Sequence, residues 1–228
     1  MSYSIVLVEP ENPKNIGFVA RAMKCNACTD LRIVSPHGES IHSEAYITGV
    51  SARPILSSAR VYKSLLDAVA DCTTVIGFSR RTFKEGPRKR TLAELQKSLI
   101  CRETSALVFG RESCGLTREE MLCCHLLCTI PSAPAMSYNL GQAAAIALYS
   151  LSYGAEQAEP VYASSTEPAP THGEEESLFK FLAHAVPNDI FTKGQRADNM
   201  RRIIHKMGCT RDELHLFMGL LKSIGKDT

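Results

Sequence analysis

The fold is decided by residues 105–151, which read SALVFGRESCGLTREEMLCCHLLCTIPSAPAMSYNLGQAAAIALYSL. The apolar run 106–109 predicts a strand that stops at Gly110, and the run 126–130 predicts a second strand that breaks into a proline-containing loop. That loop leads directly into an alanine-rich helix. Open α/β sheets bind their ligands in crevices beyond the carboxyl ends of the strands. The stretch therefore predicts a cofactor pocket at one edge of a sheet.

Strand and helix patterns alternate through the rest of the first two thirds of the chain. Short apolar runs at residues 4–8, 31–34 and 72–78 are typical of strands covered on both faces. After the first run, apolar residues recur every three or four positions, which predicts a helix carrying Gly17 and Arg21 on one side. The remaining predicted elements are short helices over 43–50 and 64–70, a short strand over 59–62, a helix capped by Thr91 with Glu94 three residues later, and a final helix over 139–153. This alternation predicts an α/β fold with a mainly parallel sheet flanked by helices.

The composition is that of a globular protein without a membrane span. Hydrophobic residues make up 44% and charged residues 22% of the 228 residues. No apolar run approaches the roughly 20 residues of a membrane span, and no charged leader precedes the first strand. The formal net charge of +2 indicates no partner by itself. We expect a cytoplasmic protein with one domain of ordinary size and an appendage.

The nine cysteines raise the question of disulfides and metal binding. Their odd number and the absence of a secretory signal favour reduced thiols. Two groups have metal-like spacing: Cys25 with Cys28, and the Cys-Cys-His segment 123–125 with Cys128. Zinc needs four converging ligands, but the first pair ends a helix and the second group leads into an apolar strand, where cysteine usually serves as a small hydrophobe. We expect no metal ion.

The last third of the chain differs in composition from the rest. Residues 154–173 are rich in Ala, Glu, Pro, Ser and Thr, which is typical of an exposed linker. Helical patterns follow at 174–185, 194–207 and 210–224. The predicted organisation is a main domain over 1–154, a linker over 155–173 and a helical extension over 174–228. So small a helical unit has little core of its own, and we expect it to dock on the main domain or on a partner subunit.

A basic loop follows the strand predicted at 72–78. It spans residues 79–90, reads SRRTFKEGPRKR, and contains one acidic residue. Its cations, which we expect to contact RNA, are Arg80, Arg81, Lys84, Arg88, Lys89 and Arg90. Phe83 offers a stacking surface for a base. A solvated surface loop is the simpler alternative, but a second basic set in the tail (Lys193, Arg196, Arg201, Arg202 and Lys206) favours RNA over a small substrate.

Three further motifs occur in order along the main domain, while the glycine motifs of dinucleotide and Walker-type sites are absent. The first is NIGFVAR at 15–21, the second is FGRE with a following Gly-Leu at 109–116, and the third runs from Ile-Pro to Ser-Tyr-Asn-Leu at 130–140. These residues resemble the three motifs of the SPOUT class (TrmH/SpoU family) of RNA 2'-O-methyltransferases. The linker and tail are similar, more weakly, to the extension of the TrmJ-type tRNA (cytidine/uridine-2'-O-)-methyltransferases.

The resemblance implies a C-terminal trefoil knot, a homodimer, and S-adenosylmethionine as the cofactor. Carried over by position, the cofactor contacts fall on Phe78, Ser79, Arg80, Gly110, Ile130, Met136, Ser137 and Tyr138. The chemistry agrees, because Gly110 allows close approach of the backbone to a ligand. The chain departs from the family pattern at Tyr138, where leucine is usual, and at Arg80 and Arg81, where smaller residues are usual.

The resemblance also implies that Arg21 is the central catalytic residue. A guanidinium is effectively never deprotonated in proteins. We therefore expect Arg21 to stay cationic, to grip the phosphate beside the target ribose and to stabilise the developing alkoxide. Asn15, Glu112 and Asn139 would fix Arg21, the ribose and the methionine moiety by hydrogen bonds.

Each of these polar residues also has a simpler interpretation. Asn15 could only cap the helix that follows it, and Asn139 could cap the helix that it precedes. Glu112 could pair with Arg111 or Arg118 at the surface.

The expected activity is S-adenosylmethionine-dependent 2'-O-methylation of RNA, on an anticodon-loop pyrimidine of tRNA by family analogy. Ribosomal RNA is the nearest alternative substrate. A non-catalytic RNA-binding module with a decayed cofactor site is an alternative of another class. A generic α/β nucleotide-binding enzyme is disfavoured by the missing phosphate loops.

Overall fold

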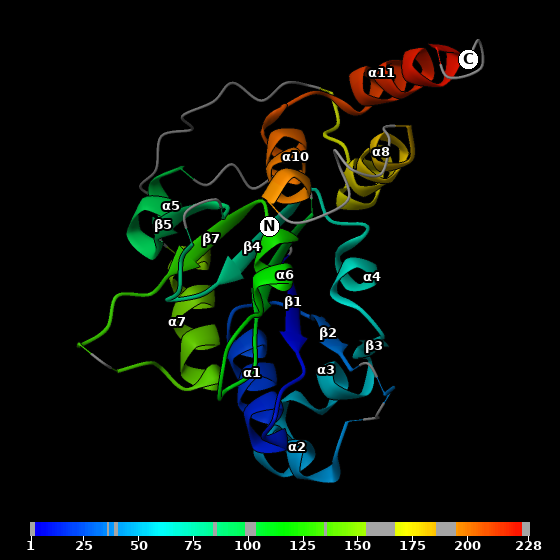
Figure 1. Ribbon diagram of the computed structural model, residues 1–228. Helices are drawn as coiled ribbons and strands as arrows, with labels where there is room; N and C mark the ends of the chain where they lie inside the picture. The colour runs from blue at the N-terminus through cyan, green and yellow to red at the C-terminus, as the bar shows by residue number, and fades with distance from the viewer. Residues whose placement is uncertain are drawn as a thin grey trace.

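The core of the protein is one parallel sheet of seven strands (Figure 1). The computed structural model describes residues 3–35, 37–38, 41–83, 86–98, 104–134, 136–153, 167–185 and 195–224. In this part of the chain the strand order is β3-β2-β1-β6-β4-β7-β5. The strands are β1 (Tyr3–Val8), β2 (Asp30–Val34), β3 (Arg60–Tyr62), β4 (Thr74–Phe78), β5 (Arg88–Thr91), β6 (Ser105–Phe109) and β7 (Leu126–Thr129). The predicted parallel α/β fold is confirmed.

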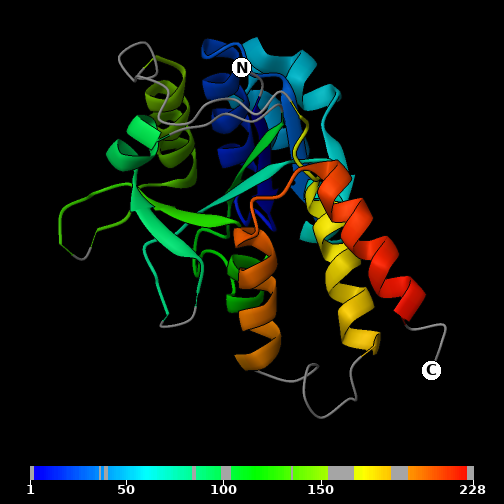
Figure 2. The same cartoon turned by 90° about the horizontal axis from the view of Figure 1, so that it is seen from above.

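Helices cover both faces of the sheet (Figure 2). The helices that follow the strands are α1 (Pro13–Cys25), α2 (Ser43–Thr48), the 3-10 turn η1 (Val50–Ala52), α3 (Arg53–Ser57), α4 (Leu65–Val69), α5 (Leu92–Ser98), α6 (Arg118–Leu122) and α7 (Leu140–Tyr153). Alternate residues of β1 pack against the helices on opposite faces of the sheet. Ile5 belongs to the core cluster under α1, α5 and α7, whereas Val6 belongs to the cluster under α4 and α6. A strand buried on both faces reads as a continuous apolar run, as β1 does.

The second half of the predicted basic loop is a strand. In β5, Arg88 lies opposite Leu126 and Arg90 opposite Cys128, so β5 pairs in parallel with β7 at the edge of the sheet. The sequence prediction of a loop throughout 79–90 is wrong here. Charged residues are depleted in interior strands but are common on edge strands, where they discourage pairing with another chain.

Side-chain caps set the ends of several helices. Thr91 and Glu94 form the predicted capping box of α5, with Thr91 N donating to Glu94 Oε2 at 2.6 Å and Glu94 N to Thr91 Oγ1 at 3.2 Å. The N-cap of α1 is Asn12, whose side chain accepts a hydrogen bond from Lys14 N at 3.0 Å. Asn15 lies inside α1, so its interpretation as a cap is wrong.

Within the described residues the tail contains the helices α8 (His172–Ala185), α10 (Gln195–Lys206) and α11 (Arg211–Ile224). They share a small apolar cluster and lie on the side of the sheet opposite α1 and α7 (Figure 2). The start of α8 is tied to the main part of the same chain, because His172 N donates to Cys72 O at 2.7 Å and Gly173 N to Ala70 O at 2.9 Å. The tail therefore docks in cis, one of the two expected arrangements.

None of the helices in the described ranges is both long enough and apolar enough to cross a membrane. The trefoil knot stays a prediction.

Candidate cofactor and RNA site

A cavity of about 530 Å³ opens where three neighbouring strands end. Its walls come from the carboxyl ends of β4, β6 and β7 and from the loop that enters α7. The rings of Phe78 and Phe109 stack at its base with centroids 4.5 Å apart. Small-molecule sites typically enclose about 300–1,000 Å³ and combine apolar walls with a few polar groups. The cavity is therefore large enough for a nucleoside-sized cofactor, at the edge that the sequence predicted.

Most of the predicted cofactor residues meet in this cavity. Those that line it are Phe78, Ser79, Arg80, Gly110, Ile130, Ser137 and Tyr138. Met136 is the exception: its side chain is 63% exposed and does not line the cavity. Its carbonyl oxygen instead accepts hydrogen bonds from Ser132 Oγ at 2.7 Å and from the Arg80 guanidinium. Met136 therefore shapes the loop through its backbone.

Gly110 makes the close approach of two backbone segments possible. A Cβ added at this position would lie 2.2 Å from the carbonyl carbon of Gly115 and 2.3 Å from Leu116 N. Gly115 itself has a φ of +68°, which favours glycine. The loop after β6 thus folds tightly against its own start, and any side chain at Gly110 would displace this loop, which lines the cavity.

Arg111 anchors the same loop through ion pairs with two glutamates. Its guanidinium pairs with Glu120 at 3.0 Å and with Glu9. The hydrogen bonds that Arg111 donates to Glu120 and Glu9 raise its pKa, despite the opposing effect of burial. The predicted pairing of Glu112 with Arg111 or Arg118 is not what the structure shows, because Arg111 uses these other two carboxylates.

Arg80 and Arg81 lie at the mouth of the cavity with their guanidinium groups bound to main-chain carbonyls. Arg80 donates to Met136 O, and Arg81 donates to Cys114 O and Leu116 O. These bonds connect the segment after β4 to the two other loops around the cavity. The two guanidinium groups form a cationic rim around the cavity.

Asn15, Glu112 and Asn139 are joined in one chain of hydrogen bonds. Asn139 Nδ2 donates to Asn15 Oδ1 at 3.0 Å, and Asn15 Nδ2 donates to Glu112 Oε1 at 2.6 Å. Glu112 also accepts from the backbone N–H groups of Glu11 and Asn12, at 2.8 and 3.2 Å. The three motifs of the sequence therefore meet physically. Asn139 caps α7 as well, because its Oδ1 accepts from Gly141 N at 2.9 Å.

Arg21 is not part of this group within one chain. It is exposed on α1 and is absent from the walls of the cavity. Gly17 is buried against α2, where an added Cβ would lie 2.1 Å from Thr48 Oγ1. Arg21 follows Gly17 by one turn on the same side of α1, as expected, but it is exposed, as is Phe18.

The other predicted RNA-binding residues lie beside the tail. Arg88 and Arg90 on β5, together with Arg202 and Lys206 on α10, line a second cavity of about 400 Å³. Lys89 Nζ instead donates to Arg80 O at 2.6 Å, which connects β5 to the mouth of the first cavity. Lys84 lies outside the described residues. A band of cations therefore runs from the cofactor cavity along β5 to α10.

Comparison with known proteins identifies the family. The sequence profile of the SpoU rRNA Methylase family matches residues 2–149. The chain belongs to the SpoU family. It is 31% identical to the tRNA (cytidine/uridine-2'-O-)-methyltransferase TrmJ of Klebsiella pneumoniae, and the match covers 96% of this chain and 95% of the relative.

Solved structures resemble this SpoU-family chain over about two thirds of its length or more. The crystal structure of TrmJ from Z. mobilis ZM4 superimposes with a TM-score of 0.84 at 25% identity, covering 97% of this chain and 98% of the other. A structure that gives insights into 2-OH methylation of C/U34 on tRNA matches with a TM-score of 0.54 at 29% identity, covering 66% and 93%. The first match includes the tail, which therefore follows a fold already seen in a TrmJ.

The cysteine groups considered as zinc ligands do not assemble in this SpoU-family protein. Within the described ranges, Cys25, Cys28, Cys124 and Cys128 belong to no group of converging metal ligands. Burial raises the pKa of the Cys28 thiol to about 11 and that of Cys128 to about 12. Cys28, Cys124 and Cys128 are buried and pack as small apolar groups.

Sequence reasoning missed the residues that brace the cavity from outside. Glu9 and Glu120 hold Arg111, and neither belongs to a motif. Glu120 had a detectable signal, because Thr117 three residues earlier forms a capping box with it at the start of α6. Glu9 gave no such signal, since its partner lies 102 residues away.

Proposed function

We propose that the protein transfers a methyl group from S-adenosylmethionine to the ribose 2'-oxygen of a pyrimidine in the tRNA anticodon loop. The observation that carries the proposal is the cavity at the ends of β4, β6 and β7, around which all three SpoU motifs are joined by hydrogen bonds. TrmJ relatives of nearly equal length support tRNA as the substrate.

The cavity fits S-adenosylmethionine in shape and chemistry. Phe78, Phe109 and Leu140 offer an apolar surface for the adenine, and Gly110 leaves main-chain groups accessible. Arg80 and Arg81 supply positive charge for the carboxylate of the methionine moiety. When bound, the cofactor supplies a methyl group already activated by its sulfonium. The protein then has to orient the ribose and assist removal of its hydroxyl proton.

Asn15, Glu112 and Asn139 act as positioning residues in this proposal. Their side chains are engaged with one another, so they hold the segments 9–15, 110–116 and 132–139 in register around the cavity. Glu112 also lines the cavity. A shift of about 1 Å in such a frame can cost roughly 100-fold in rate.

Arg21 is proposed to hold the phosphate next to the target ribose and to stabilise the alkoxide, in a homodimer and toward the partner's cavity. Its exposure on α1 and its distance from the cavity walls of its own chain support this arrangement. Exposed aromatic residues on the packed pair α1 and α7 support a dimer at this face: Phe18 is 45%, Tyr149 65% and Tyr153 54% exposed.

The cationic band is proposed to bind the RNA backbone. Arg88 and Arg90 are joined there by Arg202 and Lys206 of the tail, which lie around the same hollow. Each phosphate that such side chains neutralise releases counterions, so binding should weaken steeply with salt. We also propose the division into a methyltransferase domain (1–154), a linker (155–173) and a helical extension (174–228), and a cytoplasmic location.

Mapping 2'-O-methyl groups in RNA from cells that lack the protein tests the proposal. Loss of methylation at an anticodon-loop pyrimidine of tRNA is the expected result. Loss confined to ribosomal RNA would favour the alternative substrate. Unchanged methylation in both RNAs, together with no S-adenosylmethionine binding by calorimetry, would favour a non-catalytic RNA-binding module.

A further inference from the structure

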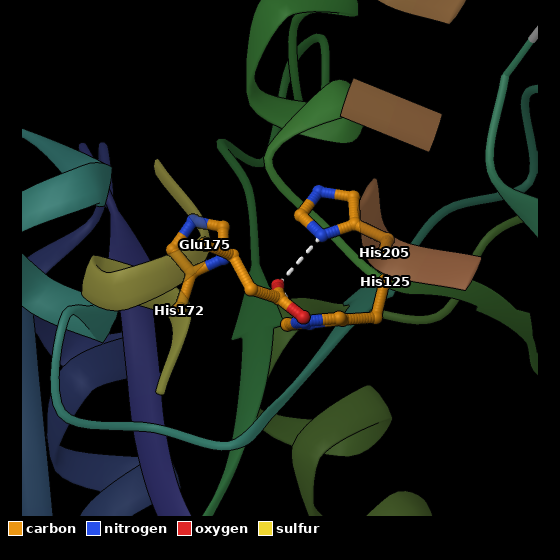
Figure 3. A group of neighbouring side chains, drawn as sticks. All are labelled: His125, His172, Glu175 and His205. Atoms are coloured by element: carbon orange, nitrogen blue, oxygen red, sulfur yellow. Dashed lines mark hydrogen bonds and ion pairs between the residues drawn. The ribbon is translucent and has the colours of Figure 1, made fainter. Parts of the chain in front are cut away.

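Four side chains that can ligate metals converge where the tail meets the sheet. His125 directly precedes β7, His172 and Glu175 lie at the start of α8, and His205 lies in the last turn of α10. One ligating atom of each lies within 4.8 Å of the others. Figure 3 shows the Glu175 carboxylate between the rings of His205 and His125, with His172 on its other side. None of the four lines the cofactor cavity.

This cluster is largely buried. His172 is 1% and Glu175 is 8% exposed. The side chains of His125 and His205 are 12% and 8% exposed. Buried histidine and carboxylate groups are held in proteins by hydrogen bonds or by metal ions, because an unpaired buried polar group costs about 1–3 kcal/mol.

Hydrogen bonds satisfy only some of the polar side-chain atoms in the cluster. Glu175 Oε2 lies 2.8 Å from His125 Nε2 and 2.9 Å from His205 Nδ1. His125 Nδ1 accepts the backbone N–H of Val75 at 2.9 Å, so its Nε2 carries the ring proton that is shared with Glu175. Two imidazole donors therefore satisfy one carboxylate oxygen.

Three buried nitrogen atoms are left over. Both ring nitrogens of His172 and Nε2 of His205 have no hydrogen-bond partner among the described residues. The two rings lie nearly parallel, with centroids 5.5 Å apart. Buried side-chain polar atoms without any partner are uncommon in folded proteins. A fully buried histidine with neither nitrogen paired points to a missing partner that accepts an imidazole lone pair.

We propose that His125, His172, Glu175 and His205 bind one Zn²⁺-class ion that fastens the helical tail to the sheet. Three imidazoles and one carboxylate suit Zn²⁺ and neighbouring transition metals, whereas Mg²⁺ and Ca²⁺ prefer oxygen ligands. Four protein ligands with no open position are typical of a structural zinc site. The ion joins three segments that are far apart in the sequence, and it does not take part in the reaction.

The site has a direct consequence for the basic hollow beside it. His125 and His205 also line the cavity that contains Arg88, Arg90 and Arg202. Holding His205 against His125 keeps α10 next to β5, so the cations of the tail stay beside those of the sheet. This consequence rests on the proposed RNA binding, but the metal site itself does not.

The four ligands should contribute unequally. Coordination through Nε2 of His125 displaces its proton to Nδ1, and the hydrogen bond from Val75 N must then open. His172 loses no hydrogen bond on binding an ion. We therefore expect His125 to be the weakest ligand and His172 to be the least dispensable.

The test is metal binding by the full chain prepared without an affinity tag of histidines. After chelation and dialysis, wild-type protein should take up about one Zn²⁺ per chain, and the Co²⁺ form should show the visible bands of a four-coordinate ion. His172→Phe and Glu175→Gln should each weaken Zn²⁺ binding by more than about 100-fold. His125→Phe should weaken it less. Mg²⁺ should not compete.

His215→Ala is the matched control, because His215 is an exposed histidine of the tail that pairs with Glu174 outside the cluster. Hydrogen exchange on wild-type protein provides a second measurement that does not depend on any variant folding. Chelation should speed amide exchange in α8 and α10 and should leave β1 unchanged. The proposal is overturned if wild-type protein binds no stoichiometric Zn²⁺, or if His172→Phe binds it as tightly as wild type.

Discussion

Glu112 connects the loop after β6 to the segment 11–15 at the start of α1. It accepts hydrogen bonds from Asn15 Nδ2 and from the backbone N–H groups of Glu11 and Asn12. An ionised carboxylate is well matched to three donors, because both of its oxygens only accept. The motif pattern predicted Glu112 as a site residue. In the structure Glu112 does not pair with Arg111, and in the proposed function it positions the loops of the cavity.

Glu112→Gln should therefore impair catalysis more than cofactor binding. The NH₂ group of the substituted side chain would face an N–H donor at a position where the carboxylate oxygen accepted a hydrogen bond. At least one loop must therefore move. We expect kcat/KM to fall by roughly 100-fold, as misplacement of about 1 Å allows, with a smaller change in the Kd for S-adenosylmethionine. Steady-state methylation and calorimetry measure the two effects. Glu119→Gln on α6 is the control, and equal rates for wild type and Glu112→Gln would contradict this role.

The hydrogen bonds and ion pairs of Asp30 should stabilise the fold in a way that depends on pH. Burial would raise the pKa of Asp30, but hydrogen bonds from Arg32, Arg60 and Ser4 outweigh it and lower the pKa to about 2. The unfolded chain has a pKa of about 3.9 for this group and so binds the proton first as the pH falls. The stabilisation is present above about pH 4 and is lost as the pH falls toward 2.

Urea unfolding at a series of pH values measures this contribution. The difference in unfolding free energy between wild type and Asp30→Asn should be largest at pH 5 and should shrink as the pH approaches 2. Asp212→Asn, at an exposed position in the first turn of α11, is the control for loss of a carboxylate. A difference that does not change with pH would contradict the pairing with Arg32.

At the scale of elements, α1 is held against α2 by close backbone contact. A Cβ at Gly17 would lie 2.1 Å from Thr48 Oγ1 and 2.3 Å from Ala45 O. Gly17→Ala should therefore separate the two helices and destabilise the protein by roughly 1–3 kcal/mol or more. Gly219→Ala is a matched control, because Gly219 is also helical but has open space around its Cα.

Gly219→Ala should instead stabilise α11 by about 0.5–1 kcal/mol, the usual advantage of alanine over glycine in a helix. Thermal unfolding of both variants compares the two effects directly. If Gly17→Ala also stabilises the protein, the packing of α1 on α2 is not as tight as described.

The elements themselves could be predicted wherever their burial is regular. The runs in β1, β4 and β6 are apolar because both faces of the sheet are covered, and a period of three or four residues marks α1. Prediction failed at β5, where Arg88–Thr91 looks like a basic loop. An edge strand gains its hydrogen bonds from β7, and local sequence carries no sign of that partner.

At the scale of the whole molecule, contacts between distant segments were beyond the reach of sequence reasoning. His125 was considered with its neighbouring cysteines, but its actual neighbours in space come from α8 and α10. The prediction of no metal ion from the sequence therefore did not consider His125 together with residues of α8 and α10. The cofactor cavity was predictable because strand ends and motifs lie in fixed order, whereas no local pattern joins two helices and the start of a strand.

The proposed homodimer leads to a prediction about which of its two cavities each Arg21 serves. Arg21→Ala leaves the cofactor cavity intact, whereas Gly110→Ala displaces the loop after β6 that lines the cavity and leaves Arg21 in place. If Arg21 serves the partner's cavity, mixing these two inactive variants should restore about a quarter to a half of wild-type activity, since each mixed dimer has one complete site. If Arg21 serves its own cavity, the mixture stays inactive.

Methyl transfer by the purified protein tests the central claim most directly. Wild-type protein is incubated with S-adenosylmethionine and a tRNA transcript, and the nucleosides are then analysed by mass spectrometry. We predict one 2'-O-methylated pyrimidine in the anticodon loop, and none when that nucleotide carries a 2'-deoxyribose. Methylation of a base, methylation that persists on the 2'-deoxy transcript, or no transfer to any RNA despite cofactor binding would contradict the account.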